Sequence, residues 1–182
     1  MKDISLHILD IAHNSVSAGA KNIIIDIRED IKDGNLNILI QDDGRGMTPD
    51  VVQRVTDPYF TSRTSRKVGL GLPLFKQNAQ MTGGDLDIES QPGRGTVVKV
   101  HFYLNHIDCP PMGDIPGVII LLVSGTTGVE WYYRHMINDK EYVFDTREVK
   151  QELEDISLSD PDVIRYLKEM IRENLNEMKS EN

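Results

Sequence analysis

The apolar residues near the amino terminus recur every three or four positions. Between residues 3 and 18 they are Ile4, Ile8, Leu9, Ile11, Ala12 and Val16. This spacing predicts an amphipathic helix, with Asp3 as a candidate N-cap and Gly19 as its stop. Polar residues, among them Asp10 and Asn14, fall on the opposite stripe of this helix.

The pattern then changes to the two-residue period of β-strands. Two such runs, 22–28 and 36–41, predict a hairpin that turns at Asp33-Gly34. Downstream, the pattern predicts a short helix from Pro49 to Val55, a helix over 72–81, and two strands over 85–90 and 96–104. The order helix, two strands, two helices, two strands predicts an α+β sandwich.

A boundary is predicted at Asp108-Cys109-Pro110-Pro111, where the pattern of residue types along the chain changes. It divides the chain into a domain over 1–105 and a C-terminal α/β extension over 106–182. The extension begins with an apolar segment, 115–123, whose structure the pattern leaves open. A hairpin over 129–136 and 141–145 and two helices over 146–155 and 161–178 complete the extension.

Composition and charge narrow the function classes. The 182 residues are 39% hydrophobic and 27% charged, which is typical of a globular protein. A formal charge of -9 argues against nucleic acid as the main partner, because phosphates require a basic surface. Cys109 is the single cysteine, so no intrachain disulfide can form, and the longest apolar run, 118–123, is too short to cross a bilayer. We therefore expect a cytoplasmic protein with no membrane partner.

Three short motifs are candidates for chemistry, and each also has an ordinary structural interpretation. Asp10 and Asn14 lie one helical turn apart, so they can place a carboxylate beside a water and an amide oxygen beside Mg²⁺. The alternative is that both are ordinary polar residues on the wet face of a helix. Asp42 ends a strand and is followed by Gly44 and Gly46. Its carboxylate can accept a hydrogen bond from an exocyclic amine, although Asp-Gly is also common in turns.

The third motif, Gly69-Leu70-Gly71-Leu72, lies where a loop becomes a helix. Free amides at the amino end of a helix are a ready anion site. Arg66 and Lys67 precede the motif, and these cations could bind a triphosphate. The alternative is that they lie on a solvated loop without a ligand.

Taken in order, the motifs resemble those of the GHKL superfamily of ATP-binding proteins, which have the Bergerat fold. The matching segments are Leu9-Asp10-Ile11-Ala12-His13-Asn14-Ser15, Asp42-x-Gly44-x-Gly46-Met47, Asp57-Pro58-Tyr59-Phe60, Gly69-Leu70-Gly71-Leu72 and Gly93-Arg94-Gly95-Thr96. The resemblance covers residues 1 to about 105. It implies a two-layer sandwich of helices on a mixed sheet, with a pocket for ATP and Mg²⁺.

The resemblance also implies a role for each matching residue. Asn14 would coordinate Mg²⁺, Asp42 would bind the adenine amine, and Thr96 would bind near the adenine. The remaining implied contacts are Gly44, Gly46 and Met47 around the adenine, Phe60 at the lid over 61–68, and Gly69, Leu70, Gly71 and Leu72 at the phosphates. Arg66 and Lys67, the candidate triphosphate ligands, fall within that lid.

One departure bears on the reaction. Family members that activate a water usually carry Glu at the position of Asp10, whose side chain is shorter by one carbon-carbon bond, ~1.5 Å. Asp10 is thus a candidate base, and either hydrolysis is slow or water is not the acceptor. The resemblance predicts a histidine kinase-like ATPase or protein kinase that transfers the γ-phosphoryl group to an unidentified partner protein, or hydrolyses ATP slowly.

Two alternatives stay open at this point. One is an ATP-gated regulatory protein of the anti-sigma type, with little or no catalysis, and the other is a degenerate copy of the fold. In the extension, the predicted hairpin over 129–145 is expected to dock on an open edge of the sheet, because an unprotected edge invites aggregation. The last helix is a candidate surface for a partner or for a homodimer.

Overall fold

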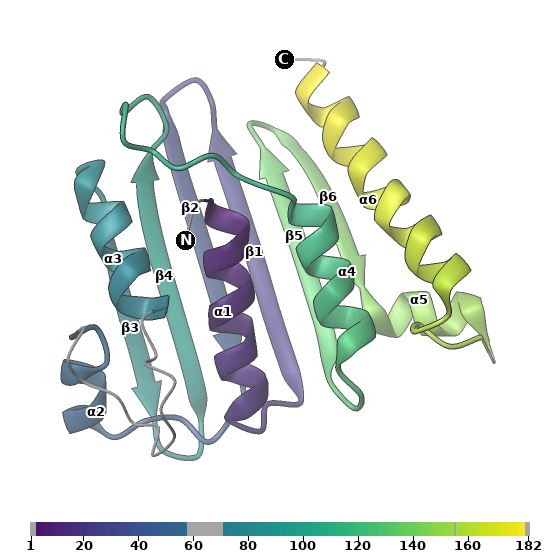
Figure 1. The fold of residues 1–182 in the computed structure, drawn as a ribbon, viewed down its shortest axis with the longest axis horizontal. Coiled ribbons are helices and arrows are strands. Elements are labelled where there is room, and N and C mark those ends of the chain that lie inside the picture. The colour runs from purple at the N-terminus through teal and green to yellow at the C-terminus, as the bar shows by residue number, and fades with distance from the viewer. Residues whose placement is uncertain (1–2, 58–70, 155, 181–182) are drawn as a thin grey trace.

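The computed structural model describes residues 3–57, 71–154 and 156–180 (Figure 1). Its elements are α1 (Ile4–Ser17), β1 (Asn22–Asp30), β2 (Asn35–Asp42), α2 (Pro49–Arg54), α3 (Gly71–Met81), β3 (Asp85–Gln91), β4 (Gly95–Tyr103), α4 (Ile115–Gly125), β5 (Glu130–Ile137), β6 (Lys140–Asp145), α5 (Thr146–Leu153) and α6 (Pro161–Ser180).

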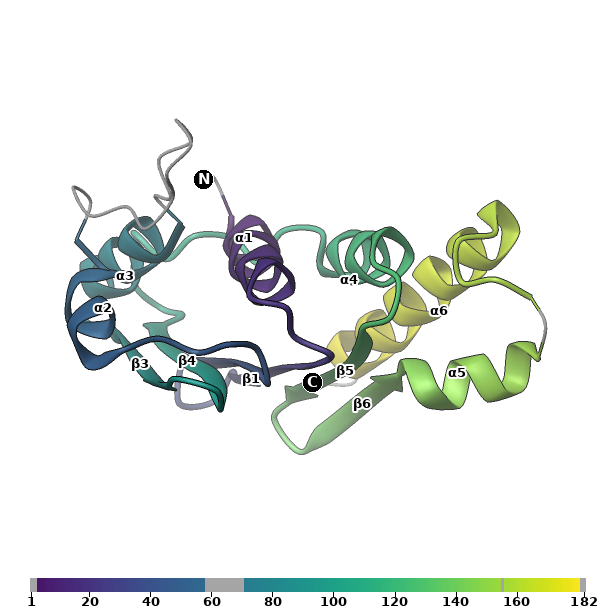
Figure 2. The same ribbon diagram turned by 90° about the horizontal axis from the view of Figure 1, so that it is seen from below.

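The described strands form one six-stranded sheet in the order β3-β4-β2-β1-β5-β6. β1 and β5 run parallel, and every other neighbouring pair among these strands is antiparallel. Figure 2 shows α1, α3, α4 and α6 on one face of the sheet and none of the described helices on the opposite face. The prediction of an α+β sandwich of helices on a mixed sheet is therefore confirmed.

The two-residue period of the strands decides which face is covered. On β1, Ile23, Ile25 and Ile27 are at most 1% exposed, whereas Asp26 and Arg28, at the alternate positions, point to the open face. Every second residue of a strand points the same way, so each strand contributes one apolar row to the core. The same alternation continues on β2 and β4.

The segment that the sequence pattern left open, 115–123, is helical. Asp114 caps α4 by accepting a hydrogen bond from the Gly117 amide at 3.0 Å, and Pro116 occupies the first turn. α4 packs between α1 and α6 and above β5, and seven of its eleven residues are buried. A helix covered on most sides needs no polar stripe, which is why its sequence carries no clear period.

The extension continues the sheet and the core of the first part of the chain. β5 pairs with β1 from Asn22 opposite Glu130 to Glu29 opposite Ile137, so the hairpin of β5 and β6 covers that edge of the sheet. The segment between β4 and α4 also covers the start of α1. The amides of Ile4 and Ser5 donate to the carbonyls of Pro111 and Met112 in this segment, each at 2.9 Å. The division into two domains at residue 105 stays a prediction. The strands before and after this position belong to the same sheet.

A buried polar chain crosses the junction between β1 and β5. His135 Nε2 lies 2.7 Å from Glu29 Oε1, and the Tyr133 hydroxyl lies 2.6 Å from His135 Nδ1. Burial, followed by Tyr142 and Glu29 nearby, raises the pKa of Tyr133 well above its usual value. The tyrosine therefore stays protonated and donates to Nδ1, while the Nε2 proton faces the carboxylate.

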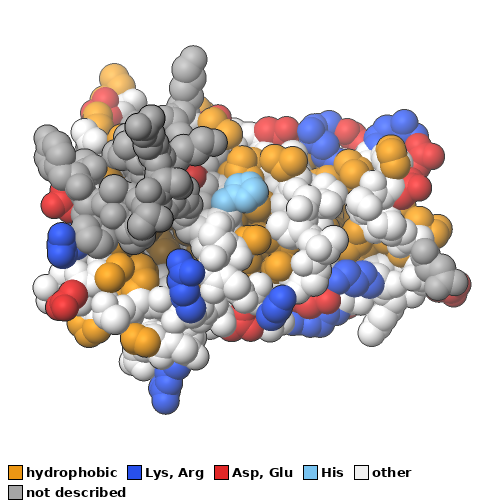
Figure 3. Space-filling view, turned by 60° about the horizontal axis from the view of Figure 1, so that its bottom comes forward, with side chains coloured by type: hydrophobic (Ala, Val, Ile, Leu, Met, Phe, Trp, Pro, Cys, Tyr) orange, Lys and Arg blue, Asp and Glu red, His pale blue; other side chains and the backbone are white. Residues whose placement is uncertain are grey.

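No helix in the described part of the chain is long and apolar enough to span a membrane. On the face that Figure 3 shows, basic and acidic side chains of the described residues alternate rather than gather by sign.

Candidate functional site

Asp42, the last residue of β2, is a buried carboxylate on the helix-covered face of the sheet, 8% exposed. Its Oδ2 accepts a hydrogen bond from Ser15 Oγ at 2.5 Å, and its Oδ1 accepts from the amides of Gly44 at 2.9 Å and Thr96 at 3.2 Å. These donors come from α1, from the loop after β2 and from β4. Together they fix the orientation of the carboxylate at one end of the sheet.

The glycines after Asp42 let this loop pack against the fold itself. A Cβ on Gly44 would lie 2.9 Å from the Cβ of Ala18, at the end of α1. Gly46 has a φ of +67°, and a Cβ there would lie 1.9 Å from the carbonyl oxygen of Gln91. A side chain at either position would push the loop away from α1 or from the β3–β4 turn.

Ser90, which belongs to none of the sequence motifs, links the loop after β2 to the β3–β4 turn. Ser90 Oγ donates to the carbonyl of Gly95 at 2.9 Å and accepts from the Met47 amide at 2.9 Å. The hydroxyls of Ser90 and Thr96 are 2.9 Å apart. Since the single Ser90 proton is used on Gly95, Thr96 donates to Ser90 and keeps its own lone pairs for another donor.

Asp43, next to the buried carboxylate, connects the loop to the start of β1. Its Oδ1 accepts from the amides of Lys21 at 2.7 Å and Asn22 at 2.9 Å, and its Oδ2 accepts from Asn22 Nδ2 at 2.6 Å. Partial burial opposes the charge on Asp43, but the hydrogen bonds from Asn22 and Lys21 outweigh it and lower the pKa of this carboxyl.

The acid on the first helix meets the start of the third. A Cβ on Gly71 would lie 1.6 Å from Asp10 Oδ2, so the carboxylate lies directly against the backbone at the amino end of α3. Asn14, one turn further along α1, is half-buried. Leu72 is buried in the core at 9% exposed. The structure thus brings Asp10 and Gly71 into contact.

Several of the predicted site residues lie outside the described residues. These are Phe60, Arg66, Lys67, Gly69 and Leu70, together with the predicted lid over 61–68.

The donor set can be tested against Mg²⁺. Within the described ranges, no group of three or more His, Cys, Asp and Glu side chains could hold a metal ion. Mg²⁺ usually keeps several waters and takes one or two protein ligands together with substrate phosphates. An amide oxygen at Asn14 and a carboxylate at Asp10 fit that sparse mode of binding, and they do not fit a cage made of protein alone.

A buried histidine lies on the same helix as Asp10. His7 is fully buried, stacks on Phe75 with ring centroids 4.5 Å apart, and has Nε2 2.8 Å from Asn78 Nδ2. Burial is the main cause that lowers the pKa of His7 to about 4. The imidazole is therefore neutral at neutral pH, and its Nδ1 has no hydrogen-bond partner among the described residues.

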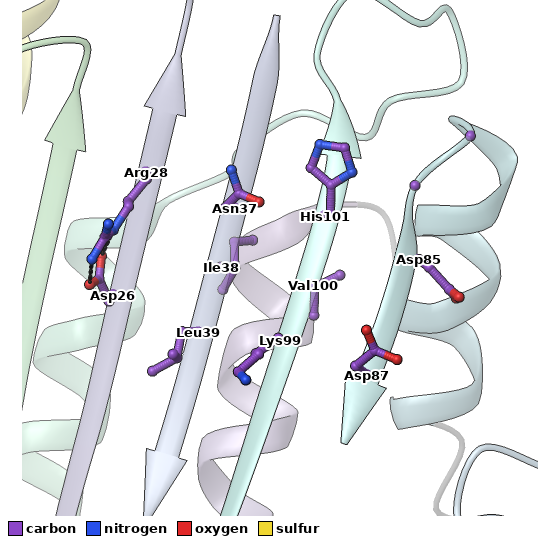
Figure 4. A pocket seen from close by; sticks show the side chains of 12 residues that line it. Asp26, Arg28, Asn37, Ile38, Leu39, Asp85, Asp87, Lys99, Val100 and His101 are labelled. Carbon is purple, nitrogen blue, oxygen red and sulfur yellow. Dashed lines mark hydrogen bonds and ion pairs between the residues drawn. The ribbon is translucent and has the colours of Figure 1, made fainter. Parts of the chain in front are cut away.

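A hollow of about 820 Å³ lies elsewhere, on the open face of the sheet (Figure 4). Its charged groups are largely paired: Arg28 binds Asp26 at 2.9 Å, and Lys99 binds Glu89 at 2.5 Å. Its lining residues do not include Asp42, which points to the helix-covered face. We therefore place the candidate site at Asp42, where the buried polar groups converge, rather than at this hollow.

Comparison with known proteins identifies the family of the chain. A model of the family described as histidine kinase-, DNA gyrase B- and HSP90-like ATPases matches residues 2–106. The chain belongs to this family, which implies a site for ATP. The resemblance to the GHKL superfamily is thereby confirmed.

The relatives that this chain resembles in sequence include histidine kinases. The chain is 30% identical over 99 residues to sensor histidine kinase ZraS of Klebsiella oxytoca, which covers 54% of this chain and 21% of the relative. It is 40% identical over 72 residues to histidine protein kinase DivJ of Caulobacter vibrioides, covering 37% of this chain and 12% of the relative. Sporulation kinase E of Bacillus subtilis is 32% identical over 100 residues, covering 55% and 13%. The matched part of the chain thus spans about a fifth or less of these relatives.

A crystal structure of the N-terminal domain of a DNA repair protein has a similar fold, with a TM-score of 0.57 and 13% identity. The likeness covers 79% of this chain and 52% of that chain. At this identity it supports the architecture alone.

Proposed function

We propose that this protein is a Mg²⁺-ATP-binding module that transfers the γ-phosphoryl group to a partner protein. The observation that carries the proposal is the buried Asp42 carboxylate, held by Ser15, Gly44 and Thr96 at the end of β2. An acceptor fixed in this way suits the exocyclic amine of adenine. The lone pairs of the Thr96 hydroxyl supply a second acceptor beside it.

The phosphate end of the ligand would lie toward α1 and α3. Amides at the amino end of α3 suit phosphate oxygens, and the Asn14 amide oxygen would hold Mg²⁺ beside them. When bound, Mg²⁺ neutralises charge on the phosphates during transfer. Asp10, which lies against Gly71 at this end, would orient the accepting group or take its proton.

Transfer to a protein is favoured over rapid hydrolysis for two reasons. Asp10 is shorter than the glutamate usual in water-activating members, and a misplacement on the order of 1 Å can lower a rate about a hundredfold. In addition, the named relatives ZraS, DivJ and sporulation kinase E are kinases.

The adenine contact is tested by Asp42→Asn, which preserves shape and reverses polarity. The amides of Gly44 and Thr96 keep the asparagine oxygen at the Oδ1 position, so its NH₂ group takes the place of Oδ2. Ser15 can accept from that group, and stability should change little. The adenine amine then meets a donor, and we expect calorimetric titration with Mg²⁺-ATP to show no binding.

Asp87→Asn is the matched control, because Asp87 is an exposed aspartate on β3 at the open-face hollow. It should bind ATP like the wild type. Failure of the wild type to bind ATP, or full binding by Asp42→Asn, would refute the proposal. Incubation with γ-labelled ATP then separates the reactions: label on a second protein supports transfer, whereas tight binding without label favours the anti-sigma-like switch.

A further inference from the structure

A chain of hydrogen bonds joins the extension to the loop that carries Asp42. It starts at Asp43, whose carboxylate binds the Asn22 side chain at 2.6 Å and the Lys21 and Asn22 amides. The Asn22 side-chain oxygen in turn accepts a hydrogen bond from Arg147 Nη2. Arg147 is the second residue of α5 and lies 125 residues from Asn22 along the chain.

Hydrogen bonds fix the backbone at the start of α5, where Arg147 lies. Thr146 is fully buried: its hydroxyl donates to Glu130 Oε2 at 2.6 Å and accepts from the Trp131 amide at 2.9 Å. Asp145 caps the helix by accepting from the Arg147 amide at 2.8 Å. This anchoring limits the entropy that the arginine loses when it binds Asn22.

The charges around Arg147 are balanced by neighbours from three elements. Asp145 Oδ1 lies 3.6 Å from Arg147 Nη1, and Glu130 on β5 binds Lys150 Nζ at 2.7 Å. Burial opposes the charge on Glu130, but hydrogen bonds from Lys150 and Thr146 and the charge of Arg147 lower its pKa. The guanidinium is thus free to use one of its nitrogens on Asn22, which fixes the Asn22 amide with Nδ2 toward Asp43.

We infer that Asn22 and Arg147 are positioning residues for adenine: the extension holds Asp43, and through it the orientation of Asp42. This inference rests on the proposed function, because it assigns these residues a part in ATP recognition. Asp42 and Asp43 are consecutive, so a rotation of the loop that releases Asp43 from Asn22 also turns the Asp42 carboxylate. The family match ends at residue 106, and Arg147 lies beyond it.

Loss of the Arg147 contact should weaken nucleotide binding without unfolding the protein. One net hydrogen bond corresponds to about a fivefold change in an equilibrium constant, and we expect Arg147→Met to raise the Kd for Mg²⁺-ATP by about that factor. Selectivity should fall as well. Guanine presents a carbonyl oxygen where adenine presents its amine, so a fixed Asp42 carboxylate repels GTP and a loosened one repels it less.

The experiment is titration of the full chain with Mg²⁺-ATP and Mg²⁺-GTP, with urea unfolding of each variant alongside. Arg165→Met is the matched control, because Arg165 is an exposed arginine of the extension that binds Asp162 within α6. Arg147→Lys keeps a cationic donor and should recover part of the affinity and selectivity. In a double-mutant cycle, Asn22→Ala with Arg147→Met should bind no more weakly than Asn22→Ala alone, since both changes break one chain.

The outcomes separate this inference from the proposed function. If the wild type binds no ATP, the proposed function fails and the inference fails with it. If the wild type binds ATP and Arg147→Met keeps the same Kd and the same ATP-to-GTP ratio as Arg165→Met, the inference alone is wrong. A purely structural role is distinguished by a lower urea midpoint with unchanged nucleotide selectivity.

Discussion

Two carboxylates are buried on the helix-covered face of the same hairpin, and their surroundings differ. Asp42 lies at one end, opposite Ile23, and Glu29 lies near the other end, opposite Leu36. The donors to Asp42 are two backbone amides and the Ser15 hydroxyl, whereas Glu29 faces a histidine from the extension. The exposed fractions are nearly equal, 8% for Asp42 and 7% for Glu29.

The difference shows that burial of a charge does not by itself identify a ligand site. His135 and Tyr133 join Glu29 Oε1 in a chain of hydrogen bonds between β1 and β5, so this carboxylate already has a side-chain partner within the fold. Buried pairs of this kind specify how two elements fit together, and here the elements are β1 and β5. We interpret Asp42 as a ligand acceptor and Glu29 as part of the joint between the ATPase fold and the extension.

The largest effect that tests this comparison is expected for His135→Ala. It leaves the Glu29 carboxylate buried without its partner, and breaking a buried pair costs about 3–5 kcal/mol. We expect urea unfolding to show a loss of this size, while protein that is still folded binds ATP with unchanged affinity.

His101→Ala provides the matched control on the open face of the sheet. His101 binds Asn35 at 3.0 Å and is only half-buried, so its loss should cost about 1 kcal/mol. Equal effects of the two substitutions would contradict the role of Glu29 and His135 in the joint. Weaker ATP binding by folded His135→Ala would contradict the separation of the two carboxylates.

His7 sharpens the comparison, because it is an ionisable group buried without a charged side chain hydrogen-bonded to it. Its folded pKa is about 4, against 6.5 for an ordinary histidine, so the unfolded chain binds more protons between these values. Stability from the neutral imidazole is therefore full above pH 6.5 and is lost as the pH falls toward 4. The shift corresponds to about 3 kcal/mol.

Substitution of His7 by phenylalanine should flatten this dependence. His7→Phe keeps a ring to stack on Phe75, and urea unfolding between pH 4 and 6.5 should show a smaller slope than in the wild type. His13→Phe, on the exposed side of the same helix, should leave the slope as it is. An unchanged slope in His7→Phe would mean that other groups cause the acid sensitivity.

Much of this fold follows from local sequence, because the elements that matter have clear periods. The 3.6-residue period in 3–18 predicts α1, and alternation predicts β1 and β2. The sequence pattern does not predict α4, because a helix buried on most sides has no polar stripe. The parallel pairing of β5 with β1 joins residues more than a hundred positions apart, and no local pattern encodes such a partner.

The candidate site was predictable in its motifs and not in its supporting contacts. Asp42 and Thr96 are adjacent across β2 and β4, as the motif order implies. Ser15 was visible as part of the first motif, but its hydrogen bond depends on how α1 lies on the sheet. Ser90 and Asn22 carry no motif signal, since a serine or an asparagine at a strand end is common and acquires its role from tertiary neighbours.

The smallest effect on stability is expected for Gly71→Ala, which tests the end of the site opposite Asp42. The added Cβ would lie 1.6 Å from Asp10 Oδ2, so the carboxylate must rotate away, at a cost of about 1 kcal/mol. If Asp10 serves the transferred phosphoryl group, label transfer from γ-labelled ATP should fall by up to a hundredfold or so, whereas Asp42 still binds the adenine. Gly125→Ala is the control, because a Cβ there meets no atom within 4 Å. Equal label transfer by the two variants would show that Asp10 has no role in the transfer, and the proposed site would then rest on Asp42 alone.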